Sequence, residues 1–190
     1  MARDRKFSTN DLFKKTTELL LQYGYEGFSF SLLADQLDVS RGTLYKYYEN
    51  KEELITDFMI HEMNQFLDEL KHIRTVEGFE NQVDFLLDLI FKNASIPRLI
   101  EIGRNIPSNL NQKVRDNLIK LEQQRFSMYH NLQEFIELGR SEGKLKPNLP
   151  DSLILGFIFQ TIVIPNHFSV PWSEWVKSIK EIICHGMLVK

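Results

Sequence analysis

The chain lacks most of the residues that hold small secreted or turn-rich proteins together. Its 190 residues include a single cysteine, Cys184, so no disulfide can form within the chain, and we expect a reducing compartment. Glycine (9) and proline (6) are both scarce, which disfavours a turn-rich all-β fold and favours helices. We interpret Cys184 as a small apolar core residue.

Long apolar runs are missing as well. The longest, from Leu153 to Pro165, is interrupted by Gln160, and it is shorter than the roughly 20 residues that a membrane-spanning helix needs. The start of the chain, MARDRKFSTNDLFKK, has no apolar stretch behind its charges and so does not resemble a signal peptide. We therefore expect a soluble, cytoplasmic protein that does not enter a membrane.

Motifs that mark common enzyme sites are also absent. The sequence contains no phosphate-binding loop and no GxGxxG, HExxH or GxSxG pattern. Its histidines lie far apart, without the spacing of metal ligands, at His61, His72, His130, His167 and His185. We expect neither an enzyme nor a protein that carries a metal or another cofactor.

The charge of the chain is distributed unevenly. The net charge is −3, yet residues 1–51 carry eight basic and seven acidic side chains. Within the first six residues, Arg3, Arg5 and Lys6 face only Asp4. This is a weak indication of an anionic partner at the N-terminal end.

Hydrophobic periodicity predicts an all-α fold of about nine helices. Ser8, Thr9 and Asn10 are possible N-caps of the first helix, Gly24 is its expected stop, and Asn50 with Glu53 forms an expected capping box for the fourth. The expected helices lie at about Asn10–Tyr23, Phe30–Leu37, Arg41–Tyr48, Asn50–Ile73, Val83–Phe91, Pro97–Pro107, Ser108–Glu142, Asp151–Ile164 and Trp172–Val189.

The third of these helices lies in the stretch SRGTLYKYYENKEEL, residues 40–54, where three tyrosines fall within four positions. At 100° per residue, Leu44 and Tyr48 share a face, which would pack on the preceding helix. Ser40 is expected to cap this helix after a tight turn that starts at Asp38. The positions left off the core face are Gly42, Thr43, Tyr45, Lys46 and Tyr47, with Arg41 at the exposed start.

Such an outward surface suits a DNA duplex. Lys46 and Lys51 can neutralise phosphates, tyrosine hydroxyls can donate to phosphate oxygens, and Gly42 lets the backbone come close to the groove wall. Two short helices joined by a tight turn form a helix-turn-helix, whose second helix enters the major groove. From the residues alone, a short helix with a solvated basic face remains the alternative.

At these residues the sequence resembles the TetR/AcrR family of bacterial transcriptional regulators. The resemblance is densest in GFSFSLLA (27–34), VSRGTLY (39–45) and YYENKEEL (47–54). It implies a helix-turn-helix DNA-binding domain at residues 1–51 and a helical effector-binding and dimerisation domain at residues 52–190. Tyr48 stands where the family usually has phenylalanine, and Asp38 where it most often has glycine. Since aspartate tolerates positive φ, we expect the turn to persist.

The resemblance also implies roles for individual residues. Those that would face bases and the adjacent backbone are Arg41, Gly42, Thr43, Lys46 and Tyr47. Those that would contact phosphates are Ser29, Ser31, Tyr45 and Lys51. Because Tyr47-Tyr48 replaces a commoner His-Phe pair, the base preference cannot be carried over from the family.

The last two helices are strongly apolar, and the first of them is apolar around most of its circumference. Two such helices from each of two chains could form a four-helix interface across a two-fold axis. Burial within one chain is the alternative. We favour the homodimer, because a two-fold dimer can bind a palindromic site.

An effector site is expected among the middle helices. Fourteen phenylalanines favour a small, largely apolar ligand. Its candidate contacts are His61, Phe85, Leu89, Arg104, Phe126, Tyr129, His130 and Phe159, with Glu101 and Gln133 as further polar candidates. For each polar candidate, ordinary core packing or a solvated helix face is the alternative.

Taken together, these features predict a DNA-binding transcriptional regulator, a ligand-responsive repressor that binds a pseudo-palindromic operator as a dimer. The competing hypothesis is a helical adaptor that binds another protein and no DNA. The two differ in whether the chain binds a duplex with a steep dependence on salt.

Overall fold

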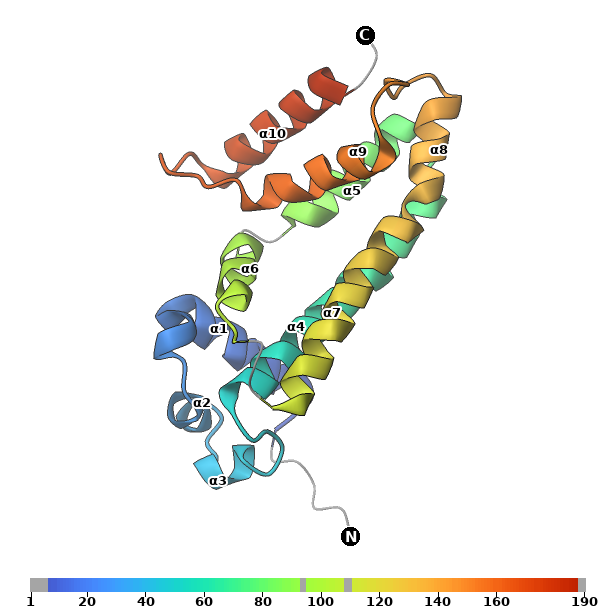
Figure 1. Ribbon diagram of the computed structural model, residues 1–190. Helices are drawn as coiled ribbons and strands as arrows, with labels where there is room; N and C mark the ends of the chain where they lie inside the picture. The colour runs from blue at the N-terminus through green and yellow to red at the C-terminus, as the bar shows by residue number, and fades with distance from the viewer. Residues whose placement is uncertain (1–6, 93–94, 108–110, 188–190) are drawn as a thin grey trace. The chain divides into compact units, whose positions relative to one another are not determined.

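The structure is a computed structural model that describes residues 7–92, 95–107 and 111–187 of the chain. Its regular elements are helices. No β-strand occurs in those ranges, so the all-α prediction is confirmed. In chain order (Figure 1), the elements are α1 (Thr9–Gly27), α2 (Phe30–Gln36), α3 (Arg41–Leu44), α4 (Lys51–Leu70), the 3-10 helix η1 (Lys71–Thr75), α5 (Phe79–Phe91), α6 (Ile96–Arg104), α7 (Gln112–Asn131), α8 (Gln133–Ser141), α9 (Asp151–Gln160), the 3-10 helix η2 (Thr161–Val163) and α10 (Trp172–Met187).

The chain folds as two compact units. The head unit comprises Met1–Met63 and Arg98–Glu122, and the C-terminal unit comprises Asn64–Pro97 and Gln123–Lys190. The core of the head unit contains Ile102 of α6, Ile106 just after it and Val114 of α7, together with residues of α1 to α4. The predicted DNA-binding domain at residues 1–51 stays a prediction. Helices α4 and α7 each begin in the head unit and end in the C-terminal unit.

Helix α1 shows how the sequence specifies the head unit. Ser8 and Asp11 form a capping box, in which the Ser8 hydroxyl accepts from the Asp11 N–H and the Asp11 carboxylate accepts from the Ser8 N–H. The stripe expected from the sequence is the buried one: Leu12, Phe13, Thr16, Leu19 and Leu20. Gly24, the expected stop, has a φ of 69° and interrupts the helix, which then continues for one more turn to Gly27.

The C-terminal unit departs from the expected pattern in one place. The helix expected over residues 108–142 is two helices, α7 and α8, which meet at Leu132, and residues 108–110 lie outside the described part. Leu132 is fully buried, its φ and ψ are −98° and 10°, and its N–H bonds to the Tyr129 carbonyl in a tighter turn. The break turns α8 so that Phe135 stacks on Phe79 of α5, with ring centroids 4.9 Å apart.

Candidate nucleic-acid interface

Helix α2 is anchored at its start by a serine cap. The backbone of Ser29 is extended, and its hydroxyl accepts from the Leu32 N–H at 3.4 Å, as expected for an N-cap. Phe30, Leu33 and Ala34 face the core of the head unit and are buried. This arrangement leaves Ser29 half-buried at the start of α2, and its contact with phosphate stays a prediction.

The turn after α2 depends on an aspartate in a left-handed conformation. Asp38 has a φ of 52°, and the next residue, Val39, donates its N–H to the Ala34 carbonyl at 3.0 Å. The prediction that Asp38 would tolerate positive φ in place of glycine is confirmed. The turn therefore reverses the chain in the few residues that a helix-turn-helix requires.

Helix α3 is shorter than predicted. The helix expected over Arg41–Tyr48 is α-helical only from Arg41 to Leu44, and a hydrogen-bonded turn follows, in which the N–H groups of Tyr47 and Tyr48 both reach the Leu44 carbonyl. The chain leaves the helical path because the ring of Tyr48 enters the core and its hydroxyl donates to Asp57 of α4 at 2.9 Å. We call residues 41–48 the recognition segment.

The predicted cap by the Ser40 side chain is wrong. Ser40 occupies the N-cap position, but its hydroxyl makes no bond to the backbone of α3. It lies 3.0 Å from the Thr43 hydroxyl instead. This pairing orients the Thr43 hydroxyl at the start of the recognition segment.

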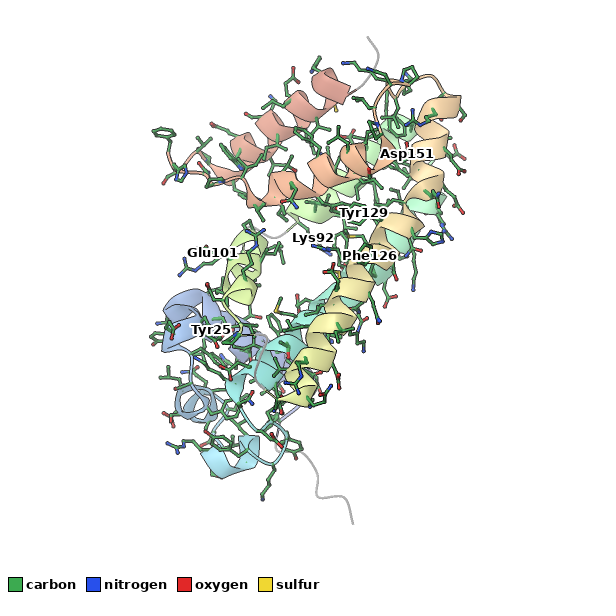
Figure 2. All side chains as sticks on the ribbon, viewed as in Figure 1. Tyr25, Lys92, Glu101, Phe126, Tyr129 and Asp151 are labelled. Carbon is green, nitrogen blue, oxygen red and sulfur yellow. The ribbon has the colours of Figure 1, made fainter. Side chains whose placement is uncertain are left out.

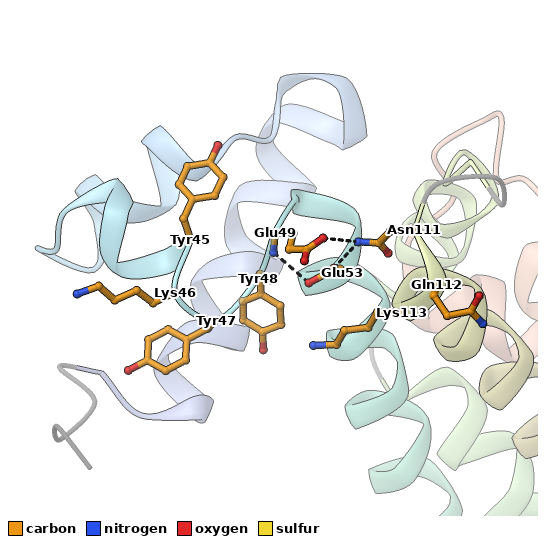
Figure 3. A pocket seen from close by; sticks show the side chains of 9 residues that line it. All are labelled: Tyr45, Lys46, Tyr47, Tyr48, Glu49, Glu53, Asn111, Gln112 and Lys113. Carbon is orange, nitrogen blue, oxygen red and sulfur yellow. Dashed lines mark hydrogen bonds between the residues drawn. The ribbon is translucent and has the colours of Figure 1, made fainter. Parts of the chain in front are cut away.

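The orientation of the recognition segment agrees with the helical-face prediction. Leu44 is fully buried and Tyr48 is 4% exposed, whereas Tyr45 is 52% exposed. Lys46 is exposed and Tyr47 is half-buried. Figure 3 shows the side chains of Lys46 and Tyr47 pointing away from the side on which Asn111 lies.

Two edge-on ring contacts hold the outward tyrosines in place. The Tyr45 ring meets Phe30 with centroids 5.0 Å apart, and the Tyr47 ring meets Phe7 at 5.9 Å. Each contact leaves part of the ring uncovered while restricting its rotation. The surface that faces outward is therefore ordered before any partner binds, which lowers the entropic cost of binding.

The basic side chains of this surface differ in how firmly they are held. The Arg41 guanidinium donates to the Ser31 hydroxyl at 3.3 Å, so two residues predicted to contact DNA meet across α2 and α3. Lys51 donates to the Tyr25 carbonyl at 2.8 Å, and its ammonium lies 4.2 Å from the centroid of the Tyr25 ring. The ammonium of Lys51 therefore already has partners within the head unit, and its binding to phosphate stays a prediction.

Tyr25 itself belongs to a contact that sequence spacing did not reveal. Its hydroxyl donates to a carboxylate oxygen of Glu52 at 2.7 Å. Burial, the bond to Glu52 and the negative charge of that group raise the pKa of the Tyr25 hydroxyl above its ordinary value. The hydroxyl therefore stays protonated and continues to tie the end of α1 to the start of α4.

Gly42 is not required by the packing of its own chain. A Cβ atom added there would meet only the Ser40 hydroxyl oxygen within 4 Å, at the ordinary contact distance of 3.8 Å. Gly42 is exposed and in a helical conformation, where alanine is the more stable residue. The small size of residue 42 therefore favours the close approach of an external partner.

A hollow of about 630 Å³ opens beside the recognition segment (Figure 3). It is lined by Tyr45, Lys46, Tyr47, Tyr48, Glu49, Glu53, Asn111, Gln112 and Lys113. Two of its lysines, Lys46 and Lys113, are exposed, and the Lys113 ammonium lies 5.2 Å from the centroid of the Tyr48 ring. The first turn of α7 thus borders the recognition segment, which its position in the sequence did not indicate.

The predicted effector contacts are divided between the two units. His61 and Arg104 belong to the head unit, where the ring of His61 packs on Phe13 at 4.9 Å and Arg104 is exposed. The others belong to the C-terminal unit: Phe85, Leu89, Phe126, Tyr129, His130 and Phe159. Their role as effector contacts stays a prediction.

Within the C-terminal unit, only some of these side chains meet. Tyr129, labelled in Figure 2, contacts Phe159 edge-on at 5.6 Å, and Phe159 also contacts Phe66 at 6.4 Å. Phe126, by contrast, is 64% exposed. His130 is exposed as well, whereas Phe85 and Leu89 are half-buried.

A buried amide pair in the C-terminal unit was missed at the sequence level. Gln124 is 9% exposed, and its Nε2 donates to the Asn64 side-chain oxygen at 2.6 Å. The Gln124 Oε1 atom is buried and has no hydrogen-bond partner among the described residues. Leaving such a group unpaired costs about 1–3 kcal/mol.

Two further features are absent from the described residues. No cluster of three or more His, Cys, Asp or Glu side chains capable of holding a metal ion occurs among them. In the same part of the chain, none of the helices combines the length and apolar character required to span a bilayer.

Comparison with known proteins resolves which helix-turn-helix this is. A family model described as bacterial regulatory proteins, tetR family, matches residues 12–57. Residues 12–57 therefore form a helix-turn-helix domain of the TetR family. The chain is a helix-turn-helix transcriptional regulator, as predicted.

Relatives of this chain are similar to it over most of its length. A helix-turn-helix-type transcriptional regulator of Staphylococcus aureus (strain USA300) is 24% identical over 137 residues, which is 70% of each chain. FadR from Bacillus subtilis, solved in complex with stearoyl-CoA, superposes with a TM-score of 0.70 at 19% identity and covers 94% of this chain and 99% of its own. The ketosteroid regulator KstR2 of Mycobacterium tuberculosis superposes with a TM-score of 0.73 at 14% identity, over 100% and 98%. At these identities the two structures establish the fold alone.

Proposed function

We propose that this TetR-family regulator binds a pseudo-palindromic DNA operator as a homodimer and is released from it, as a repressor, when a small apolar effector binds. The observation that supports DNA contact most directly is the division of the recognition segment. Leu44 and Tyr48 are buried in the head unit, while Tyr45 and Lys46 face solvent. A segment packed in this way presents a fixed surface to a groove.

The contacts fall into two classes with different consequences. We assign contacts with base edges and the adjacent backbone to Arg41, Gly42, Thr43, Lys46 and Tyr47. We assign contacts with phosphates to Ser29, Ser31, Tyr45 and Lys51. Phosphate contacts set affinity for any duplex, whereas contacts to base edges set the sequence preference. Loss of Arg41 or Tyr47 should therefore change which sequences bind.

The dimer is assigned to the outer surfaces of α9 and α10. Leu153, Phe157 and Ile182 are 57%, 45% and 62% exposed, which is unusual for large apolar side chains in helices. Gly156 lies on the same face of α9 as the first two, and Gly186 lies four residues after Ile182 on α10. A Cβ atom at either glycine would meet nothing within 4 Å.

Both glycines lower the stability of their own helix without serving the packing of their own chain. Small residues beside exposed apolar ones are what close helix packing between two chains requires. A second copy of the chain could pack against both helices at once, because a two-fold interface brings the same surface of two chains together.

An apolar effector agrees with two observations. The C-terminal unit contains the aromatic contacts of Phe159 with Tyr129 and Phe66. Among proteins of similar fold, FadR was solved with stearoyl-CoA, and KstR2 is described as a ketosteroid transcriptional regulator. The unpaired Gln124 oxygen offers one polar contact to a hydroxyl or amine of such a ligand. The effector acts on DNA binding only if it binds one conformation more tightly than the other. We place the protein in the cytoplasm, where its operator and effector would be accessible.

The first experiment is selection of bound sequences from a pool of random duplexes, followed by titration of the selected operator at several salt concentrations. DNA binding through phosphate contacts predicts a linear fall of log K with log salt. A chain that binds no duplex at low salt would instead support the adaptor hypothesis.

A further inference from the structure

Glu53, in the first turn of α4, is a buried carboxylate: it is 3% exposed. A buried carboxylate is tolerated only when hydrogen-bond donors surround it. One donor is the backbone N–H of Glu49, 3.0 Å from Oε2. The second is the side-chain amide of Asn111, which contacts Oε1 and lies 58 residues further along the chain.

Asn111 uses both ends of its amide. Its Oδ1 accepts from the Val114 N–H at 3.0 Å and thereby caps the start of α7. Its Nδ2 donates to Glu53 and also to the Glu49 carboxylate at 3.1 Å. The dashed lines in Figure 3 show these contacts converging just beyond the recognition segment.

The first half of α7 is also fixed against α4 by contacts around this pair. Val114 is fully buried in the core of the head unit. Asn117 donates to the Thr56 hydroxyl at 3.0 Å. The apolar contact supplies adhesion, whereas the directional hydrogen bonds determine the register between the two helices.

We propose that Asn111 and Glu53 are positioning residues for DNA recognition, although neither belongs to the surface assigned to DNA. They hold the backbone at Glu49, so that Lys46 and Tyr47, which we assign to base edges, keep the placement that a groove requires. This inference rests on the proposed DNA-binding function.

The central variant is Asn111→Asp. An aspartate retains the oxygen that caps α7 but has no N–H to donate, and it adds a third carboxylate beside Glu49 and Glu53. The affinity for the selected operator should fall by roughly tenfold, the effect of losing a hydrogen bond to a buried charged group. The affinity for a random duplex should change much less, because it depends on phosphate contacts. The ratio of the two affinities is therefore the measured quantity.

Three further variants make the test specific. Asn111→Asp with Glu53→Gln exchanges the donor and the acceptor, so the ratio should return toward that of the parent. Asn105→Asp is the matched control for charge, because Asn105 is exposed on the head unit and its side chain donates locally, to the Glu101 carbonyl. Asn111→Ser retains a capping hydroxyl and adds no charge, so it replaces Asn111→Asp if that variant does not fold.

The outcomes separate this inference from the proposed function. A parent protein without duplex binding overturns both. A parent that binds its operator, together with a folded Asn111→Asp or Asn111→Ser variant of unchanged affinity ratio, overturns only the positioning role. Equal losses for operator and random duplex, or an exchange variant no better than the single one, would also overturn it. The positioning role is supported if Asn111→Asp lowers the ratio of operator affinity to random-duplex affinity and the exchange variant restores that ratio.

Discussion

The ring of Tyr45 meets the ring of Phe30 edge-on, with centroids 5.0 Å apart and planes at 66°, while 52% of Tyr45 remains exposed. Phe30 is buried in the head unit, so the outward tyrosine is braced by the core. The hydroxyl of Tyr45 can therefore be removed without removing the ring contact, which separates a role in DNA binding from a role in folding.

Tyr45→Phe should weaken binding to every duplex and leave the unfolding free energy unchanged. The loss of one phosphate hydrogen bond corresponds to about 0.5–1.5 kcal/mol of binding free energy. Fluorescence anisotropy with operator and random duplexes measures the affinity, and thermal unfolding provides the stability. Equal affinity of Tyr45→Phe and the parent for both duplexes would contradict a phosphate contact at this hydroxyl.

Gly42→Ala should move stability and DNA affinity in opposite directions. Alanine is favoured over glycine in a helix by up to about 1 kcal/mol, and the added methyl group meets no close neighbour within the chain. The unfolding free energy should therefore stay the same or rise, while affinity for the operator falls because the backbone is held further from the groove. A variant with raised stability and full operator affinity would show that Gly42 does not approach DNA.

Lys46 and Lys51 form a matched pair for separating charge from structure. Each lysine changed to methionine should reduce the slope of log K against log salt by about 1 if it neutralises one phosphate. Lys51→Met should also lower the unfolding free energy, because the Tyr25 carbonyl loses its donor. Lys46→Met should not, because Lys46 is exposed. An unchanged salt slope for Lys51→Met would assign Lys51 to folding alone.

Tyr25 predicts a loss of stability at high pH. Its pKa is raised in the folded state, chiefly by burial and then by the bond to Glu52, so above the ordinary tyrosine pKa of about 10 the folded chain binds more protons than the unfolded chain. The free energy of unfolding should therefore be fully retained below that pH and decline above it. Denaturant titrations of the parent and Tyr25→Phe between neutral pH and pH values above 10 test this, with the parent expected to decline more steeply. Parallel pH profiles would contradict it.

A substitution at Gly156 should affect the stability of one chain and the association of two chains in opposite directions. Gly156→Ala should raise the stability of α9 by up to about 1 kcal/mol, since the added methyl group meets open space in the single chain. It should weaken the dimer, because the same methyl group would enter the interface. Sedimentation equilibrium measures the dimer dissociation constant. A dimer of unchanged affinity would place the interface elsewhere.

Local features of the head unit could be predicted from the sequence because they depend on neighbours along the chain. The buried stripe of α1, the positive φ of Asp38 and the burial of Leu44 beside an exposed Tyr45 all follow from helical periodicity and turn chemistry. The residue at which α3 ends could not be predicted in this way, because it depends on the bond from Tyr48 to Asp57, nine residues away on another helix.

Contacts between distant segments were beyond the reach of sequence patterns. Lys51 and the Tyr25 carbonyl are 26 residues apart, and Asn111 and Glu53 are 58 apart, so no periodicity relates them. The break at Leu132 has a similar origin, since no glycine or proline marks it and a buried leucine lies at the break. In each case the tertiary contact, rather than local preference, determines the conformation.

The most direct test of DNA recognition by residues 41–48 is to select duplexes from a random pool with the parent and with Arg41→Ala. The parent should enrich two inverted half-sites, and its binding should weaken steeply with salt. Arg41→Ala should bind with an altered or relaxed preference at defined positions of each half-site. If the parent enriches no sequence, or if both proteins enrich the same sequence equally, residues 41–48 do not read DNA as proposed.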